Sequence, residues 1–244
     1  NWSSQEPGDA FFGMGSKAKR GQKILESGKE YSIQVEYKWE GRFPAVQIGM
    51  LAPDDHDLME AAVNLAKASD ATILLVGTNS DWETEGNDRD SLALPLRQNE
   101  LIEKVCKANK NTVVVLNTGS PCEMPWNDEA NAILQCWFPG QEFGNSLADI
   151  IFGKVNPSGK LPTTFPIKLE DTPAYNTYPG KDLQMDYEEG LYIGYRWYEK
   201  ENITPLYPFG HGLSYTSFSY SDIRAIPPKG TSSVAAFELE ITNT

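Results

Sequence analysis

The feature that most constrains the fold is an alternation of apolar strands with amphipathic helices through the middle of the chain. Three runs are continuously apolar and rich in Val, Ile and Leu, as expected for strands buried on both faces. These strands are expected at 70–77, 112–117 and 132–138. Helical periodicity is found at 57–67, 95–107 and 141–152. The alternation predicts an α/β fold with a mostly parallel sheet sandwiched by helices.

Each of the first two helices has an apolar stripe of the kind that faces a protein core. Asp57 is placed to cap the first helix. Its inward stripe is predicted to hold Leu58, Ala61, Ala62, Leu65 and Ala66. The inward residues of the second helix are predicted to be Leu96, Leu101, Ile102 and Val105.

Period-two alternation marks both ends of the chain. Apolar and polar residues alternate from Tyr31 to Tyr37, and a second strand is expected at 45–50. Alternation returns after Ser214. We therefore expect β-sandwich segments to flank the α/β region at both ends. The stretch 153–213 is rich in Pro, Gly and aromatic residues, and a loop this long is expected to be functional or to wrap a neighbour.

Charge and motif content exclude several classes of protein. The formal net charge is −13, which disfavours binding to nucleic acid or to an anionic membrane surface. No apolar run approaches the ~18 residues that a membrane helix needs. Neither a G-x-G-x-x-G nor a Walker A phrase occurs, so a nucleotide-binding α/β protein is the least favoured class. No cofactor is implied.

Three cysteines give no sign of a disulfide framework or a zinc site. Cys106, Cys122 and Cys136 have spacings that match no zinc pattern. Cys106 and Cys136 lie in apolar runs and are expected to be packing residues. The phrases Asn1-Trp2-Ser3 and Asn202-Ile203-Thr204 are glycosylation acceptor patterns, so a secreted and a cytoplasmic location both stay open.

Ligands of parallel sheets bind beyond the carboxyl ends of the strands, which here are the loops 77–94, 118–127 and 138–141. The first of these loops has five carboxylates, one Arg and one Trp in residues 81–90. It could be a solvated acidic loop, and it lacks the spacing of an EF-hand calcium site. A carboxyl group beside an aromatic side chain can also act as a general acid, because partial desolvation favours its protonated form.

Five phrases resemble the glycoside hydrolase family 3 β-glucosidases, in that family's order. The run Trp82-Glu83-Thr84-Glu85-Gly86-Asn87-Asp88-Arg89 resembles their acid/base loop. Four later phrases also resemble the family, at 112–121, 137–144, 156–166 and 208–216. The resemblance implies hydrolysis of terminal non-reducing β-D-glucosyl residues with retention of configuration.

The resemblance also implies roles for individual residues of this loop. Glu85, the Glu before Gly-x-Asp-Arg, is expected to be the general acid/base, with Glu83 as the alternative. Asp88 and Arg89 are expected to brace the loop by a charge-assisted pair. Trp82 is a candidate sugar platform or a loop anchor. Asn87 stands where many relatives have Tyr, which leaves hydrogen bonding in place of stacking on the leaving group.

Other candidate residues are given structural roles. Asp81 lies in a Ser-Asp-Trp phrase like the one around the family's nucleophile, but the phrase falls in the acid/base loop and is treated as coincidence. His56 is expected to be exposed, and His211 to form a tight turn. An aromatic cluster is expected to pack the segment 153–213 onto the sheet or onto a barrel domain that is expected outside this chain. Its members are Tyr187, Tyr192, Tyr195, Trp197 and Tyr198.

By the same resemblance, 1–52 is the end of a protective-antigen-type β-domain and 53–213 is the carboxyl-side part of the α/β sandwich domain. Residues 214–244 are the start of a fibronectin-type-III-like domain. The nucleophile, an Asp on a barrel domain, is expected outside this chain, which would then be a fragment with half of an active site. Its expected partners are β-glucosides or oligosaccharides and the remaining barrel part, and a homo-oligomer stays possible.

Two alternatives stay open. A non-catalytic carbohydrate-binding or interaction module would keep the sheet without the chemistry, although the Glu-Gly-x-Asp-Arg phrase argues against it. A β-xylosidase of the same family is the other, because the residues that recognise the glycone are expected mostly on the absent barrel.

Overall fold

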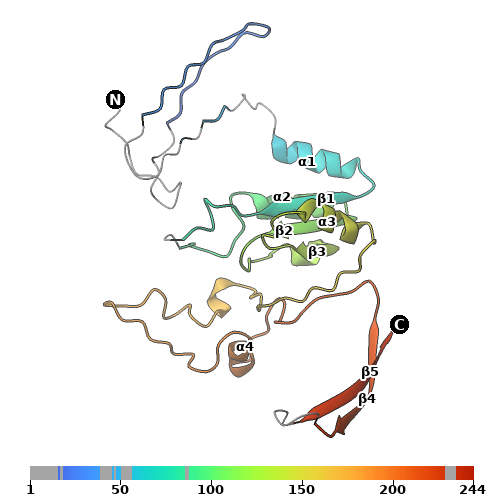
Figure 1. Ribbon diagram of the computed structural model, residues 1–244. Coiled ribbons are helices and arrows are strands. Elements are labelled where there is room, and N and C mark those ends of the chain that lie inside the picture. The colour runs from blue at the N-terminus through green and yellow to red at the C-terminus, as the bar shows by residue number, and fades with distance from the viewer. Residues whose placement is uncertain are drawn as a thin grey trace. The chain divides into compact units, whose positions relative to one another are not determined.

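The structure is a computed structural model that describes residues 16, 19–38, 46, 48–50, 57–85, 88–228 and 235–244. The chain divides into two compact units, Asn1–Phe138 and Pro139–Thr244. Figure 1 labels the helices and strands and colours them by residue number.

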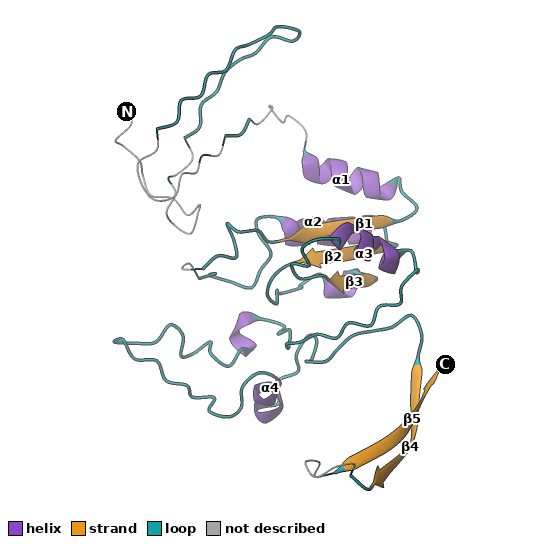
Figure 2. Ribbon diagram, viewed as in Figure 1, coloured by secondary structure: helices purple, strands orange, loops and turns teal. Residues whose placement is uncertain are grey.

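The first unit contains a parallel three-stranded sheet in the order β1-β2-β3 (Figure 2). The strands are β1 (Thr72–Gly77), β2 (Thr112–Asn117) and β3 (Ala132–Gln135). Thr72 pairs with Thr112, and Val113 pairs with Ala132. The predicted α/β class with a parallel sheet is confirmed.

The central strand of this sheet forms the core of the unit. Val114, Val115 and Leu116 of β2 are 0% exposed, as their continuously apolar sequence predicts for a strand covered on both faces. Burying each such side chain is worth about 1.5–3 kcal/mol relative to exposure. On β1, in contrast, Ile73 and Leu75 of one face are exposed.

The helix α1 (Leu58–Lys67) begins where the sequence predicts. The Asp57 carboxylate accepts hydrogen bonds from Met59 N (3.0 Å) and Glu60 N (3.2 Å), so the predicted N-terminal cap is confirmed. This cap satisfies two backbone donors that the first turn leaves without a helical partner.

The inward face of α1 differs from the predicted stripe. α1 packs against α2 (Gln98–Ala108), and Ala66 is its buried residue. The face that includes half-buried Met59, Ala62 and Val63 is the one turned inward, whereas Leu58, Ala61 and Leu65 are exposed. The prediction for those three is wrong, because the i, i+3, i+4, i+7 series that packs starts at position 59.

The helix α2 begins later than predicted. Leu96 has φ 54°, a left-handed conformation that cannot be part of a right-handed helix. Its side chain is 95% exposed, so its predicted inward position is wrong. Ile102, Val105 and Cys106 of α2 are buried, and α2 contacts both β2 and the short 3-10 helix η1 (Asn127–Glu129).

The cysteines are only partly as predicted. Cys106 is buried, but Cys122 is buried as well, and Cys136 is half-buried. Desolvation raises the pKa of all three thiols, to about 12 for Cys122.

Residues 31–37 do not form the strand that their alternation predicts. Chain 19–38 turns at Gly28, with Lys29 N donating to Glu26 O (3.3 Å). Ile33 and Val35 are exposed. Alternation gives a strand only where another backbone completes the ladder, and no ladder forms for 31–37 within the described residues. The expected strand at 45–50 and the position of His56 lie partly or wholly outside those residues.

The second unit contains the remaining helices and an antiparallel ribbon. Its helices are α3 (Phe143–Ile151), η2 (Leu169–Asp171) and α4 (Tyr195–Glu201). β4 (Phe218–Ile226) pairs with β5 (Ala236–Asn243). This ribbon confirms the predicted β structure after Ser214. Nearly all of its residues are exposed, including Tyr220, Phe237 and Ile241.

Within the second unit, the long loop is held by a few local contacts. His211 lies in a turn, with its N–H donating to Pro208 O (3.0 Å) and its C=O accepting from Leu161 N (2.8 Å). The predicted structural turn is therefore confirmed. In the aromatic cluster, Tyr198 is buried, which raises its pKa to about 12, while Tyr187 is exposed.

Candidate functional site

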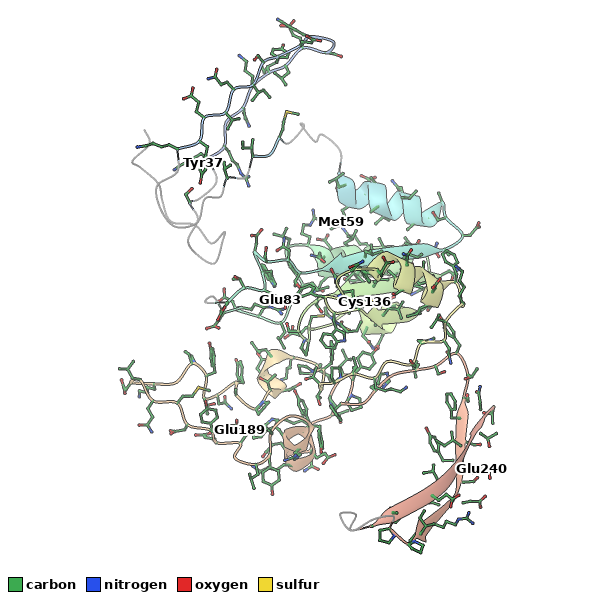
Figure 3. All side chains as sticks on the ribbon, viewed as in Figure 1. Tyr37, Met59, Glu83, Cys136, Glu189 and Glu240 are labelled. Atoms are coloured by element: carbon green, nitrogen blue, oxygen red, sulfur yellow. The ribbon has the colours of Figure 1, made fainter. Side chains whose placement is uncertain are left out.

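The acidic loop begins where β1 ends, at the carboxyl edge of the sheet. We call residues 78–97 the β1 loop and residues 118–126 the β2 loop. Because β1 and β2 are parallel neighbours, the two loops leave the same edge side by side. Figure 3 shows Glu83 in the β1 loop, beyond the ends of the strands.

The start of the β1 loop is fixed by a side chain from α2. Gln98 Oε1 accepts from Gly77 N and Gln98 Nε2 donates to Gly77 O, both at 2.8 Å. Gly77 also lies close to β2, because a Cβ atom there would be 2.1 Å from Asn117 O. Glycine is therefore required at the last position of β1.

The next residues form a turn around Asn79. Asn79 O accepts from Trp82 N (3.0 Å) and from Glu83 N (2.8 Å), and its side-chain oxygen accepts from Asp81 N (3.0 Å). Asn favours such turns because its side chain can replace a backbone acceptor. Asp81 is exposed in this turn.

Glu83 is directed inward from the turn and joins the two loops. Its Oε1 accepts from Thr78 Oγ1 (2.5 Å) and from Gly119 N of the β2 loop (3.1 Å). The same oxygen lies 3.9 Å from Arg89 Nη1, and both side chains are 15% exposed. These contacts, which come from both loops, hold the Glu83 carboxylate in place.

Arg89 provides a second link between the loops. Its Nη1 donates to Ser120 Oγ (2.7 Å) and its Nη2 to Ala93 O (3.4 Å). A third link is made by the backbone, where Glu123 N donates to Leu92 O (2.9 Å). The β1 loop is therefore attached to the β2 loop both before and after its tip.

The β2 loop is packed into the unit. Thr118 and Cys122 are 0% exposed and Trp126 is 2% exposed. Thr118 accepts from Gln135 Nε2 of β3 at its Oγ1 (3.0 Å). Trp126 Nε1 donates to Asn99 Oδ1 of α2 (2.9 Å). The β2 loop therefore provides a rigid base for the β1 loop.

The residues predicted to perform chemistry lie in different environments. Glu85 is exposed at the tip of the β1 loop, two residues after Glu83. Trp82 is half-buried, and its Nε1 is buried without a hydrogen-bond partner among the described residues. Asp88 is exposed. Asn87 lies outside the described residues.

Sequence reasoning missed several residues that shape the site. Gly119 and Ser120 fall within a phrase that resembles the family, but nothing in the sequence indicates that they contact Glu83 and Arg89. The contact between Gln98 and Gly77 could not be predicted from the sequence, because polar residues are common in the first turn of a helix. Among the described residues, no group of three His, Cys, Asp or Glu side chains is arranged to hold a metal ion. None of the helices in the described part of the chain has the length and apolar character to span a membrane.

The fold is similar to that of solved glycoside hydrolases. The family model of the glycosyl hydrolase family 3 C-terminal domain matches residues 10–215. The chain therefore belongs to this family.

Relatives and solved structures agree with this membership. The chain is 41% identical to a probable β-glucosidase I of Aspergillus clavatus, over 91% of this chain and 28% of the relative. Among solved structures, a β-glucosidase from Kluyveromyces marxianus in complex with glucose is 42% identical, with a TM-score of 0.73 over 80% of this chain and 23% of that one. A family 3 β-glucosidase from Bifidobacterium adolescentis is 41% identical, with a TM-score of 0.71 over 80% of this chain and 29% of that one. The chain thus spans less than a third of the length of these proteins.

Proposed function

We propose that this chain supplies the general acid/base of a retaining β-glucosidase that removes terminal non-reducing β-D-glucosyl residues. Glu85 is the proposed acid/base. The proposed nucleophile is an Asp on a barrel domain outside this chain. The names of the relatives support β-glucosidase activity, and one of the solved relatives holds glucose.

The observation that carries the proposal is the contrast between Glu85 and Glu83. A general acid/base must reach the glycosidic oxygen and later a water molecule, so its carboxyl group must be accessible. Glu85 is exposed at the tip of the β1 loop. The carboxylate of Glu83 is 15% exposed and accepts two hydrogen bonds from its own protein. Glu85 is therefore the better candidate.

The proposed mechanism has two steps. In the first, the nucleophile attacks the anomeric carbon while Glu85 donates a proton to the leaving oxygen. In the second, Glu85 accepts a proton from water, which attacks the glycosyl-enzyme and restores the original configuration. The two carboxyl groups of retaining enzymes lie about 5–5.5 Å apart.

The remaining residues of the loop complete the proposed site. Trp82 and Asn87 would contact the sugar or the leaving group. Arg89 braces the loop through Ser120 and Ala93, and Asp88 would act with it. The division into 1–52, 53–213 and 214–244, with the flanking segments belonging to a protective-antigen-type and a fibronectin-type-III-like domain, is part of this proposal.

The test is Glu85→Gln in the full-length enzyme that contains this segment. With poor leaving groups such as methyl or phenyl glucosides, kcat/KM should fall about 10²–10⁴-fold, the usual contribution of general acid–base catalysis. With a dinitrophenyl glucoside it should change little, because that leaving group needs no protonation. Azide, which attacks without a base, should restore turnover and give the β-glucosyl azide.

Asp81→Asn is the matched control, since Asp81 is an exposed carboxylate of the same loop. It should leave all of these values unchanged. Equal losses on every leaving group in Glu85→Gln, without azide rescue, would mean that Glu85 is structural. Sugar binding by the full-length protein without turnover of any glycoside would favour a non-catalytic module. Paired aryl glucoside and xyloside kinetics would identify a β-xylosidase.

A further inference from the structure

We infer that Glu83 is a positioning residue that fixes the acid/base loop on the β2 loop and thereby sets the place of Glu85. This inference rests on the proposed function, because it assigns Glu83 an effect that is exerted through Glu85. Glu83 itself would not contact the substrate.

The contacts of Glu83 come from both loops and converge on one atom. Oε1 accepts from Thr78 Oγ1 at the start of the β1 loop and from the backbone N–H of Gly119 in the β2 loop. Arg89 Nη1 lies 3.9 Å away and is itself bound to Ser120 Oγ (2.7 Å). A single carboxylate therefore links the two sides of the β1 loop to its neighbour.

The space around Gly119 shows how closely Glu83 is fitted. A Cβ atom at Gly119 would lie 2.5 Å from Glu83 Oε2 and 2.7 Å from Phe138 Cε2. A side chain at position 119 would therefore displace the carboxylate or the ring. The absence of one lets the carboxylate approach the backbone N–H of Gly119.

The part of the β2 loop that binds Glu83 is itself buried and hydrogen-bonded. Thr118, directly before Gly119, is fully buried and bound by Gln135. Glu85 follows Glu83 by two residues, so a shift of the Glu83 carboxylate is transmitted to the tip through a short piece of backbone. Misplacement of a reacting group by about 1 Å can lower a rate about 100-fold.

The experiment compares Glu83→Ala, Glu83→Gln and Thr78→Val in the full-length enzyme, with Asp81→Asn as control. Glu83→Ala should lower kcat/KM for a phenyl glucoside about 100-fold and change that for a dinitrophenyl glucoside much less, because protonation is the step that is misplaced. Glu83→Gln should retain more activity than Glu83→Ala, since its amide oxygen can still accept from Thr78 and Gly119. Thr78→Val should show the same leaving-group pattern with a smaller loss.

The pH profile and the melting temperature separate the possible outcomes. The inference predicts that Glu83→Ala keeps the basic limb of the kcat/KM profile, because the proposed general acid, Glu85, is still present. The inference would be overturned if kcat/KM fell equally with both leaving groups and in proportion to a fall in melting temperature. Unchanged kinetics in all three variants would overturn it as well. Loss of the basic limb in Glu83→Ala, with activity kept in Glu85→Gln, would instead show that Glu83 is the acid/base and would overturn both proposals.

Discussion

The β1 loop and the β2 loop leave the same edge of the sheet, yet they have opposite characters. The β2 loop buries Thr118, Cys122 and Trp126 and is bound to β3 and α2. The β1 loop has an exposed carboxylate at its tip, and on either side of that tip Glu83 and Arg89 link it to the β2 loop. Under the proposed function, the difference corresponds to a division of roles, in which the packed β2 loop supports the β1 loop that holds Glu85.

The largest expected effect comes from removing the main packing residue of the β2 loop. Trp126→Ala should lower the free energy of unfolding by about 3–5 kcal/mol, as is usual for a buried aromatic side chain, because Trp126 is 2% exposed. Denaturant unfolding would measure it. Trp126→Phe should cost less, since it keeps most of the apolar area and loses the bond to Asn99. A loss below 1 kcal/mol in Trp126→Ala would contradict the rigid role of this loop.

The next effect concerns thiol reactivity. Burial raises the pKa of Cys122 from 9.0 to about 12, so its thiolate fraction at pH 8 should be about a thousand times lower than that of an ordinary cysteine. Alkylation by iodoacetamide followed by mass spectrometry should leave Cys122 unmodified in the folded protein and modify it in denaturant. Rapid labelling of the folded protein would mean that the β2 loop opens readily.

A smaller effect is expected where the β1 loop begins. Gln98→Leu removes both hydrogen bonds to Gly77 and should lower the free energy of unfolding by about 1–3 kcal/mol, the cost of leaving partly buried groups unpaired. Thermal or denaturant unfolding would detect this. If Gln98→Glu, which keeps only the acceptor for Gly77 N–H, matched the original residue, the donor half of this contact would be unimportant.

The smallest effect should come from the exposed part of the β1 loop. Asp81→Ala keeps the backbone turn around Asn79, because Asp81 contributes its N–H and not its carboxylate. The free energy of unfolding should change by less than about 0.5 kcal/mol. A loss near that of Gln98→Leu would show that the side chain of Asp81 contributes to stability as much as the contacts at the start of the loop.

The sheet was predicted well from the sequence, because its buried strands are continuously apolar. A short run rich in Val, such as Thr112–Asn117, is typical of a strand covered on both faces. The sequence did not predict which face of α1 packs inward or where α2 begins, because tertiary packing and backbone conformation determine these features. Leu58 and Leu65 looked like core residues, but the surface that α1 packs against selects the face of Ala66. Leu96 fits the helical period, yet its φ is positive, so the residue lies outside α2.

The candidate site was predictable only as a set of residues. Glu83 and Glu85 are chemically identical and two positions apart, and the resemblance to a family ranked them. The environment that separates them depends on Gly119 and Ser120, which are distant in sequence and become neighbours only when β1 and β2 pair. Local periodicity contains no information about such a contact.

The arrangement at Gly77 has a practical consequence for protein engineering. The side chain of Gln98 accepts a hydrogen bond from the N–H of this glycine and donates one to its C=O. One amide group therefore holds the two ends of the β1 loop together. Between these ends, Glu83, Arg89 and Leu92 also contact the β2 loop. A replacement for the segment between positions 77 and 98 would therefore need these contacts as well as glycine and glutamine at the two junctions.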